Sequence, residues 1–289
     1  MKRQLVNRLT DEGTSLPAAL KAAELSSSSY YYCPVVNRKP RALDTELVAA
    51  ISIVRHGHSE VYGYRKITRA LKAQGMTVNA KKVLRHLRTM GLTQPRNVKG
   101  LRWTRPAVVK PDAPNNYWEA DFTYVWTGQG NAYLCAIIDA WDRDIVGDIF
   151  SDRCRAVEAA EALEKAVLER FGGKVPEGHQ LTLRVDRGSQ FRAHRFRETA
   201  RLLNVRLEYA GIRCPEDKPY IESFNSSYKT EEIYRHEYRS IQEARTGWET
   251  YRAWYRSDRL HQSLDYLSPL QYAQKVQNTI LLVADFTPV

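Results

Sequence analysis

Apolar and polar residues alternate along three consecutive stretches in the second half of this 289-residue chain. The stretches are YWEADFTYVW (117–126), NAYLCAIIDA (131–140) and RDIVGDIFS (143–151), and polar or glycine-containing turns separate them. A two-residue period is typical of half-buried β-strands, because successive side chains point to opposite faces of a sheet. We therefore predict three consecutive strands.

The pattern becomes helical after the third strand. We predict a helix over 155–171 that ends at two glycines, followed by a strand (181–186), a helix (about 194–204), a strand (205–210) and helices from about 218 and 240. A meander followed by alternating helices and strands predicts an α/β fold with a mixed sheet. This order of elements is that of an RNase H-like fold.

Helical periodicity dominates the first half of the chain. Residues 16–25 form a short amphipathic pattern, and the serines of the following SSSSYYY segment are suited to cap a second helix. The pair is either a helix-turn-helix or an ordinary helix pair.

A stronger helix-turn-helix pattern lies between residues 64 and 91. Gly75 ends a first helix, and Asn79 is placed to cap AKKVLRHLRTM (80–90), which Gly91 terminates. The predicted inner face of this second helix consists of Val83, Leu84, Leu87 and Met90. Its outer face is cationic and suits a DNA groove. We predict DNA contacts by Lys81, Lys82, Arg85 and Arg88, and by Arg65 and Lys66 on the first helix.

The charge distribution supports this assignment. Of the net charge of +11, residues 1–111 contribute 21 Lys and Arg against 6 Asp and Glu, whereas residues 112–289 contain 23 against 27. A block this basic most often meets a polyanion such as nucleic acid, although charge also serves solubility alone.

Five segments follow from these patterns. We predict a helical segment at 1–45, an all-α helix-turn-helix DNA-binding domain at 46–93, a proline-containing linker at 94–116, a catalytic α/β domain at 117–275 and a tail at 276–289. The linker cations Lys99, Arg102 and Arg105 are placed to follow DNA phosphates, or the segment is a plain connector.

Neither the cysteines nor the hydropathy indicate export. Cys33, Cys135, Cys154 and Cys214 are scattered without a CxxC pair, which predicts reduced thiols. There is no signal-peptide pattern and no apolar run of about 18 residues. We expect a soluble, cytoplasmic protein without membrane contact.

Three carboxylates occupy distinctive local settings. Asp121 lies within the first strand, on the face opposite Trp118 and Phe122, and Asp186 ends the strand at 181–186. Gly188 and Ser189 follow Asp186, where we expect a tight turn and a helix cap. Glu222 lies one turn into the helix from 218, with 35 residues separating it from Asp186.

This set of residues suits phosphodiester chemistry. Two divalent ions about 3.5 to 4 Å apart activate the nucleophile and stabilise the leaving oxygen, and hard oxygen ligands suit Mg²⁺ or Mn²⁺. We therefore predict that Asp121, Asp186 and Glu222 are catalytic and hold two metal ions. Lys229 follows Glu222 by seven residues, nearly two helical turns, and is placed to bind substrate phosphate.

The blocks WEADFTYV, LRVDRGSQF and CPEDKPYIESFNSSYKTEE resemble the integrase core of DDE transposases from bacterial insertion sequences. The spacing and Lys229 match that family. HSEVYGYRKITRALKAQGMTVNAKKVLRHLRTMGL is similar to the helix-turn-helix block of the second-frame (OrfB) proteins of the insertion-sequence-three family, and RLHQSLDYLSPLQY (259–272) resembles its closing motif. The likeness covers roughly residues 16–273.

This resemblance implies an Mg²⁺-dependent transposase for DNA integration and recombination. Such an enzyme binds terminal inverted repeats, nicks a 3′ end and joins the freed hydroxyl to another phosphodiester. It implies a homo-oligomer on paired DNA ends and, in some members, an upstream-frame OrfA partner. Where the closing motif usually opens with Tyr-Asn, this chain has Tyr255 and Arg256, and we interpret Arg256 and His261 as structural.

Two other functions remain open. The first is a DNA-binding regulator of transposition with an inactive core. The second is a related enzyme, either an RNase H-like nuclease or a retroviral-type integrase. The absence of a paired His and Cys zinc module before the core disfavours the retroviral type.

Overall fold

The computed structural model describes residues 2–32, 42–93, 111–211 and 217–285. They form two compact units, Met1–Asp44 and Thr45–Val289. Within the described ranges, no helix is long and apolar enough to cross a membrane. Cys135 and Cys154 are free thiols, whereas Cys33 and Cys214 lie outside the described residues.

The first unit is a small helical body. It contains α1 (Lys2–Asp11), α2 (Leu16–Ala22) and α3 (Ser27–Tyr31), packed around Val6, Ala19 and Ala23. The predicted serine cap is present, because the Ser26 hydroxyl accepts the backbone N–H of Ser29 at 3.2 Å. Helix α1 was not predicted as a separate element, and Val6 is its one buried residue.

The second unit begins with three helices joined by short turns. They are α4 (Thr45–Val54), α5 (Tyr64–Ala73) and α6 (Ala80–Thr89), with the 3₁₀ turn η1 (Gly57–Val61) after α4. Asn79 caps α6 as predicted, accepting the N–H of Lys81 at 2.8 Å. The three helices share a core that includes Ile51, Ile67, Leu71, Val83 and Leu87.

A five-stranded mixed sheet follows. Its strands are β1 (Tyr117–Thr127), β2 (Gly130–Asp139), β3 (Ile145–Ser151), β4 (Leu181–Val185) and β5 (Val205–Tyr209). The order is β3-β2-β1-β4-β5; β1 to β3 pair antiparallel, and β1, β4 and β5 pair parallel. The predicted α/β class and strand order along the chain are confirmed.

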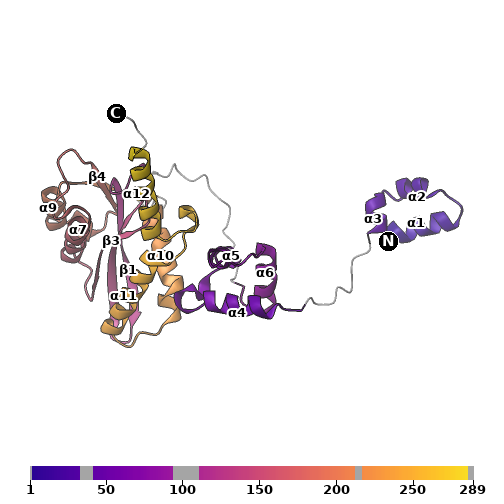
Figure 1. Ribbon diagram of the computed structural model, residues 1–289, viewed down its shortest axis with the longest axis horizontal. Helices are drawn as coiled ribbons and strands as arrows, with labels where there is room; N and C mark the ends of the chain where they lie inside the picture. Colours follow the sequence, from indigo (N-terminus) through magenta and orange to yellow (C-terminus); the bar gives the residue numbers. More distant parts are fainter. Residues whose placement is uncertain (1, 33–41, 94–110, 212–216, 286–289) are drawn as a thin grey trace. The chain divides into compact units, whose positions relative to one another are not determined.

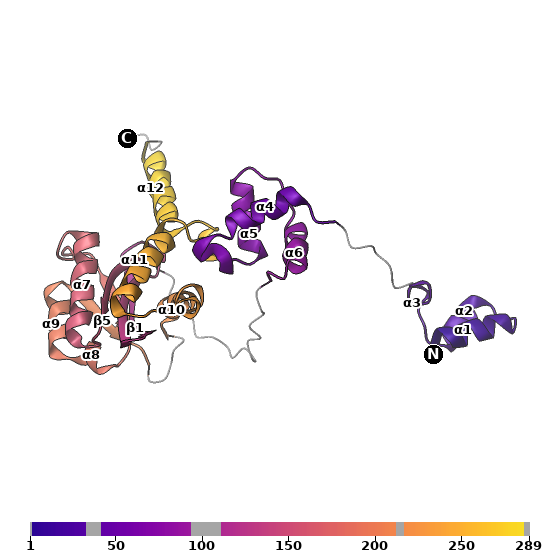
Figure 2. The same ribbon diagram turned by 90° about the horizontal axis from the view of Figure 1, so that it is seen from below.

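Helices cover both faces of this sheet (Figure 1). One face carries α7 (Ala156–Phe171), α8 (Ser189–Arg192) and α9 (His194–Leu202). The other carries α10 (Pro219–Glu231) and α11 (Ile241–Ser257), and Figure 2 shows the same separation from below. The remaining elements are η3 (Ile233–Arg235), η4 (Gln262–Leu264) and α12 (Pro269–Asp285). The expected boundary between core and tail at 275 falls inside α12.

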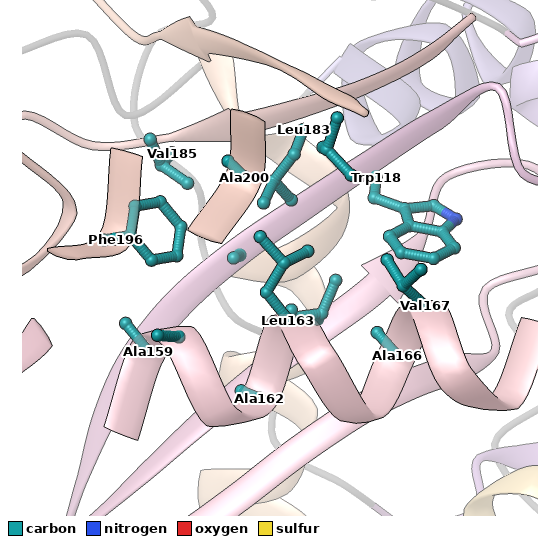
Figure 3. Close-up of a cluster of buried hydrophobic side chains, with 14 of the residues drawn as sticks. Trp118, Ala159, Ala162, Leu163, Ala166, Val167, Leu183, Val185, Phe196 and Ala200 are labelled. Carbon is teal, nitrogen blue, oxygen red and sulfur yellow. The ribbon is translucent and has the colours of Figure 1, made fainter. Parts of the chain in front are cut away.

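Small residues bring α7 close to the sheet. Ala159, Ala162 and Ala166 lie along the inner face of α7, near Trp118 and Leu183 (Figure 3). A methyl group on Gly147 of β3 would meet the Ala162 carbonyl oxygen at 2.5 Å and the Ala166 Cβ at 2.6 Å. The alternation in β1 has the predicted sense, since Trp118 and Ala120 enter this core while Glu119 faces α10.

Candidate active site

Asp121 is held between the sheet and α10. It lies in β1 opposite Ala136 of β2. Its Oδ1 accepts the ammonium of Lys218 at 2.8 Å, and its Oδ2 accepts the amide of Asn225 at 2.9 Å. Burial raises the pKa of Asp121, the ammonium of Lys218 opposes this, and the negative charge of Asp186 raises the pKa further. Asp186 therefore lies close enough to act on Asp121 electrostatically.

Asp186 lies directly after β4, as predicted. Its Oδ1 accepts the backbone N–H of Gly188 at 2.7 Å, and a methyl group on Gly188 would lie 2.7 Å from the same oxygen. The tight turn is thus present. The expected cap is wrong, however: Gly188 is the N-cap of α8, and Ser189 is already its first helical residue.

Glu222 and Lys229 project from α10 into one hollow with Asp121. The Asp121 hollow, as we call it, has a volume of about 430 Å³. It is lined by Asp121, Phe122, Thr123, Tyr124, Glu222, Asn225, Ser226, Lys229, Thr230 and Tyr234. Asp186 is not among the lining residues. Over the four described ranges, no three His, Cys, Asp or Glu side chains are gathered closely enough to hold one metal ion.

Two charged residues that were not predicted as site residues, Glu119 and Lys218, fix α10 to β1. Glu119 is fully buried, and its Oε2 accepts the backbone N–H groups of Tyr220 and Ile221, both at 2.9 Å. Burial raises the pKa of Glu119 to about 7, although those two N–H groups and Lys218 favour its ionised form. Lys218 is 5% exposed and forms the ion pair with Asp121. The two-residue alternation of β1 placed Glu119 on the same face as Asp121, and this was the one sequence signal for its role.

The charge and donors around Asp121 suit a divalent cation. Asp121 and Glu222 offer hard oxygen atoms to a single hollow, and the half-buried Asp121 lies near a second carboxylate. In this structure the Lys218 ammonium supplies the compensating positive charge.

The predicted DNA-contacting residues differ in exposure. On α6, Lys81 and Arg88 are exposed, while Lys82 and Arg85 are half-buried. On α5, Arg65 is exposed. The linker cations Lys99, Arg102 and Arg105 lie outside the described residues.

Lys66 departs from the expected outward orientation. Its ammonium lies 4.6 Å from the centroid of the Tyr62 ring. Burial, together with the nearby charge of Arg259, lowers the pKa of Lys66 to about 7. This side chain faces the closing segment rather than open solvent.

The closing segment 259–272 is a structural junction. Arg259 donates to both carboxylate oxygens of Glu231, at 2.6 and 2.7 Å, and to the Ser227 hydroxyl at 3.0 Å. Burial and the charge of Arg259 lower the pKa of His261 to about 2, so its imidazole is neutral. Leu260, which lies between Arg259 and His261, donates its N–H to the Tyr62 hydroxyl at 2.9 Å. The structural interpretation of His261 is confirmed.

Arg256 is likewise structural. It pairs with Asp144 at 2.7 Å and with Glu169 at 2.8 Å, so it joins α11 to the turn after β2 and to α7. Arg256 therefore makes its ion pairs away from the Asp121 hollow, which it does not line.

Known protein families match nearly all of the second unit. The integrase core domain model matches residues 111–215, and a second integrase core domain model matches 203–269. An HTH-like domain model matches 42–100. The catalytic domain is thus an RNase H-like integrase core, and α4 to α6 form the HTH-like domain.

Relatives that are named as transposases match most of the chain. The transposase for insertion sequence element IS904 of Lactococcus lactis is 30% identical over 253 residues, covering 82% of this chain and 98% of that protein. A putative transposase for IS986/IS6110 of Mycobacterium tuberculosis is 30% identical over 272 residues, covering 87% and 97%. A simian T-cell lymphotropic virus intasome chain aligns at a TM-score of 0.44 and 14% identity, covering 72% of this chain and 68% of that one. The chain belongs to the transposases of bacterial insertion sequences, in the group of the insertion-sequence-three family.

Proposed function

We propose that this transposase binds the terminal inverted repeats of its element and cuts and joins DNA strands at the Asp121 hollow. The observation that carries the proposal is the placement of Asp121, Glu222 and Lys229 around one hollow, with Asp186 close enough to raise the pKa of Asp121. Acidic oxygens beside a cation suit a phosphodiester, because the carboxylates hold metal ions and the lysine holds phosphate.

We infer that Asp121, Asp186 and Glu222 hold two Mg²⁺ or Mn²⁺ ions. When bound, such ions activate a hydroxyl nucleophile and stabilise the leaving oxygen. The residues of this chain orient the substrate: Lys229 neutralises a phosphate, and Asn225 fixes Asp121 Oδ2. Glu119 positions the first turn of α10, which carries Glu222, through the N–H groups of Tyr220 and Ile221.

The direct test is an end-joining assay. The full chain is incubated with a duplex ending in the inverted repeat that brackets its gene, with a second DNA as target. Joined products are expected with Mg²⁺ or Mn²⁺ and none after chelation by EDTA. DNA binding without any metal-dependent product would instead favour the regulator with an inactive core.

We infer that the exposed cations of α6 contact DNA phosphates and that the protein acts as a homo-oligomer on paired ends. Replacing Lys81 or Arg88 with Ala should weaken binding and lower the slope of log K against log salt by about one per residue. Titrations at several salt concentrations measure this slope. Lys174→Ala, which removes an exposed lysine from the net-negative half, is the matched control. An unchanged slope in both α6 variants would contradict the assignment.

A further inference from the structure

A second hollow lies at the carboxyl ends of β4 and β5. The arginine hollow, as we call it, has a volume of about 540 Å³ and is lined by Arg187, Ser189, Arg192, Ala193, Arg197 and Tyr209. Strands β4 and β5 run parallel, so their carboxyl ends meet at one edge of the sheet, where open α/β sheets usually bind ligands. The chemistry proposed above uses none of these lining residues.

The three arginines reach the hollow from successive parts of the chain. Arg187 lies in the turn after β4, directly after Asp186, whereas Arg192 ends α8 and Arg197 lies in α9. All three residues are exposed. The Nε of Arg187 donates to the Ala210 carbonyl oxygen at 3.1 Å, and this bond holds the guanidinium across the ends of the two strands.

The positive charge of this hollow is not balanced by its neighbours. No acidic side chain lines it. The acidic residues of α9 and β5 pair with other arginines: Glu198 with Arg201 at 2.7 Å, and Glu208 with Arg184 at 2.8 Å. Within the four described ranges, none of the three lining arginines forms an ion pair. The arginine hollow therefore offers its charge to a ligand.

The sequence around the hollow is basic in an otherwise acidic half of the chain. Residues 187–206 contain six Arg and a single acidic residue, Glu198, although residues 112–289 contain 27 acidic against 23 basic residues. Exposed charges on a helix often serve only solvation. Here three guanidinium groups from different elements surround one hollow without a carboxylate, which is the arrangement expected of an anion site.

The ligand that suits this arrangement is a phosphodiester backbone. A planar guanidinium donates two parallel N–H bonds to phosphate oxygen atoms, and exposed arginines are well suited to nucleic acid for this reason. The Tyr209 hydroxyl donates to the Phe191 carbonyl oxygen at 3.0 Å, so it is fixed at the rim. Because Arg187 directly follows Asp186, a backbone bound here lies beside the proposed catalytic carboxylates.

We propose that the arginine hollow binds backbone phosphates of the target DNA, the duplex to which the cut end is joined. This inference rests on the proposed function, in which two DNA molecules meet at the same carboxylates. In an in-line displacement the attacking and leaving oxygens lie on opposite sides of the phosphorus. The Asp121 hollow and the arginine hollow share no lining residue, so each is placed to hold one DNA backbone.

The type of contact favours the target over the element end. Contacts between arginine and phosphate fix the position of a duplex but carry no sequence information. Such contacts suit a target that is not defined by a terminal repeat, whereas the repeat requires contacts that read bases.

The experiment measures joining against target concentration for Arg192→Ala and Arg197→Ala in the full chain. The end DNA is supplied already nicked, so the joining step alone is followed. Each phosphate contact changes log K by about 0.9 times log salt, which makes it worth about tenfold near 0.1 M salt. The half-saturating target concentration should therefore rise about tenfold in each variant, while the rate at saturating target stays at the wild-type value.

Arg195→Ala is the matched control. Arg195 is exposed and lies between Arg192 and Arg197 in the sequence, but it does not line the arginine hollow. Its replacement removes the same charge and should leave the half-saturating target concentration unchanged. Nicking of the end DNA in the absence of target should proceed at the wild-type rate in all three variants.

A second readout needs no catalysis. Phenylglyoxal modifies exposed arginine side chains, and mass spectrometry locates the modified residues. Target duplex is added without metal to wild-type protein that is already bound to its end DNA. It should protect Arg192 and Arg197 from modification, while Arg195 keeps reacting.

Three outcomes would overturn the inference while leaving the proposed function intact. Equal target dependence in the Arg195→Ala variant and the two hollow variants would make the arginines a solvated surface. Equal losses of nicking and joining, or protection by the end DNA alone, would assign the hollow to the element end instead. If the wild-type chain forms no metal-dependent product, the proposed function fails first, and protection of Arg192 and Arg197 by the added duplex still tests the contact.

Discussion

Replacing Asp186 with Asn should reduce DNA strand transfer about 100- to 1,000-fold while DNA binding persists. The expected size follows from electrostatic catalysis, in which removal of even one preorganised stabilising group costs about 10² to 10³ in rate. Asn has the shape of Asp without its charge, and its side-chain oxygen can still accept the N–H of Gly188. The measurement is the rate of joined product at saturating Mg²⁺, with a gel-shift titration for binding.

The same loss is expected for Asp121→Asn and Glu222→Gln, but the three variants should differ in stability. Lys218 is 5% exposed and pairs with Asp121, so Asp121→Asn leaves a buried ammonium without its counterion. Asp186 has no such partner among the described ion pairs, which makes its variant the cleanest probe of chemistry. Thermal unfolding should therefore shift more for Asp121→Asn than for Asp186→Asn.

The control for this series is Asp152→Asn. Asp152 has a side chain that is 61% exposed, and it does not line the Asp121 hollow. It should join DNA at the wild-type rate. Strand transfer that survives in any one of the three site variants would remove that residue from the catalytic set.

Local patterns in the sequence were sufficient to predict the strands of the sheet and the ends of two helices. The two-residue period of 117–126 predicted β1 and placed Asp121 on the face opposite Trp118, because that alternation is a property of the strand itself. Asn79 and Gly75 likewise marked the ends of α6 and α5, since caps and helix breaks depend on a few neighbouring residues. The family motifs then located the three carboxylates.

The contacts that assemble the site could not be predicted in this way. Glu119 meets the N–H groups of Tyr220 and Ile221 across about a hundred residues of chain, and Lys218 meets Asp121 across a similar separation. Buried charges normally look like surface charges in a sequence, because only the tertiary partner makes their burial tolerable. Lys66 shows the same limitation: helical spacing alone did not reveal that its ammonium faces Tyr62.

The interior of the second unit also joins its HTH-like helices to the catalytic domain. His58 of η1 pairs with Glu232 at 2.9 Å, and its ring lies 5.1 Å from that of Trp254. Leu260 donates its N–H to the Tyr62 hydroxyl. Leu260 directly follows Arg259. The buried ion pair of Arg259 with Glu231 therefore holds the contact between Leu260 and Tyr62 in place, as well as the end of α10.

Replacing Arg259 with Ala should therefore destabilise the protein by about 3 to 5 kcal/mol. Arg259 and Glu231 are 7% and 6% exposed, and the guanidinium bonds both carboxylate oxygens. Although burial disfavours its charge, the Glu231 carboxylate raises the pKa of Arg259. Loss of the guanidinium leaves a buried carboxylate whose one remaining side-chain donor among the described residues is the Tyr251 hydroxyl, at 2.9 Å. At about 2 to 4 °C per kcal/mol for a unit of this size, the melting temperature should fall by roughly 10 °C.

Arg201→Ala provides the matched control, because it breaks the Arg201–Glu198 pair whose side chains are 69% and 40% exposed. Exposed pairs contribute about 0 to 1 kcal/mol, so this variant should melt within a few degrees of the wild type. Adding Glu231→Gln to Arg259→Ala removes the unpaired charge and should recover part of the loss. If the Arg259→Ala and Arg201→Ala variants melt at the same temperature by calorimetry, the buried pair is not what holds the closing segment to α10.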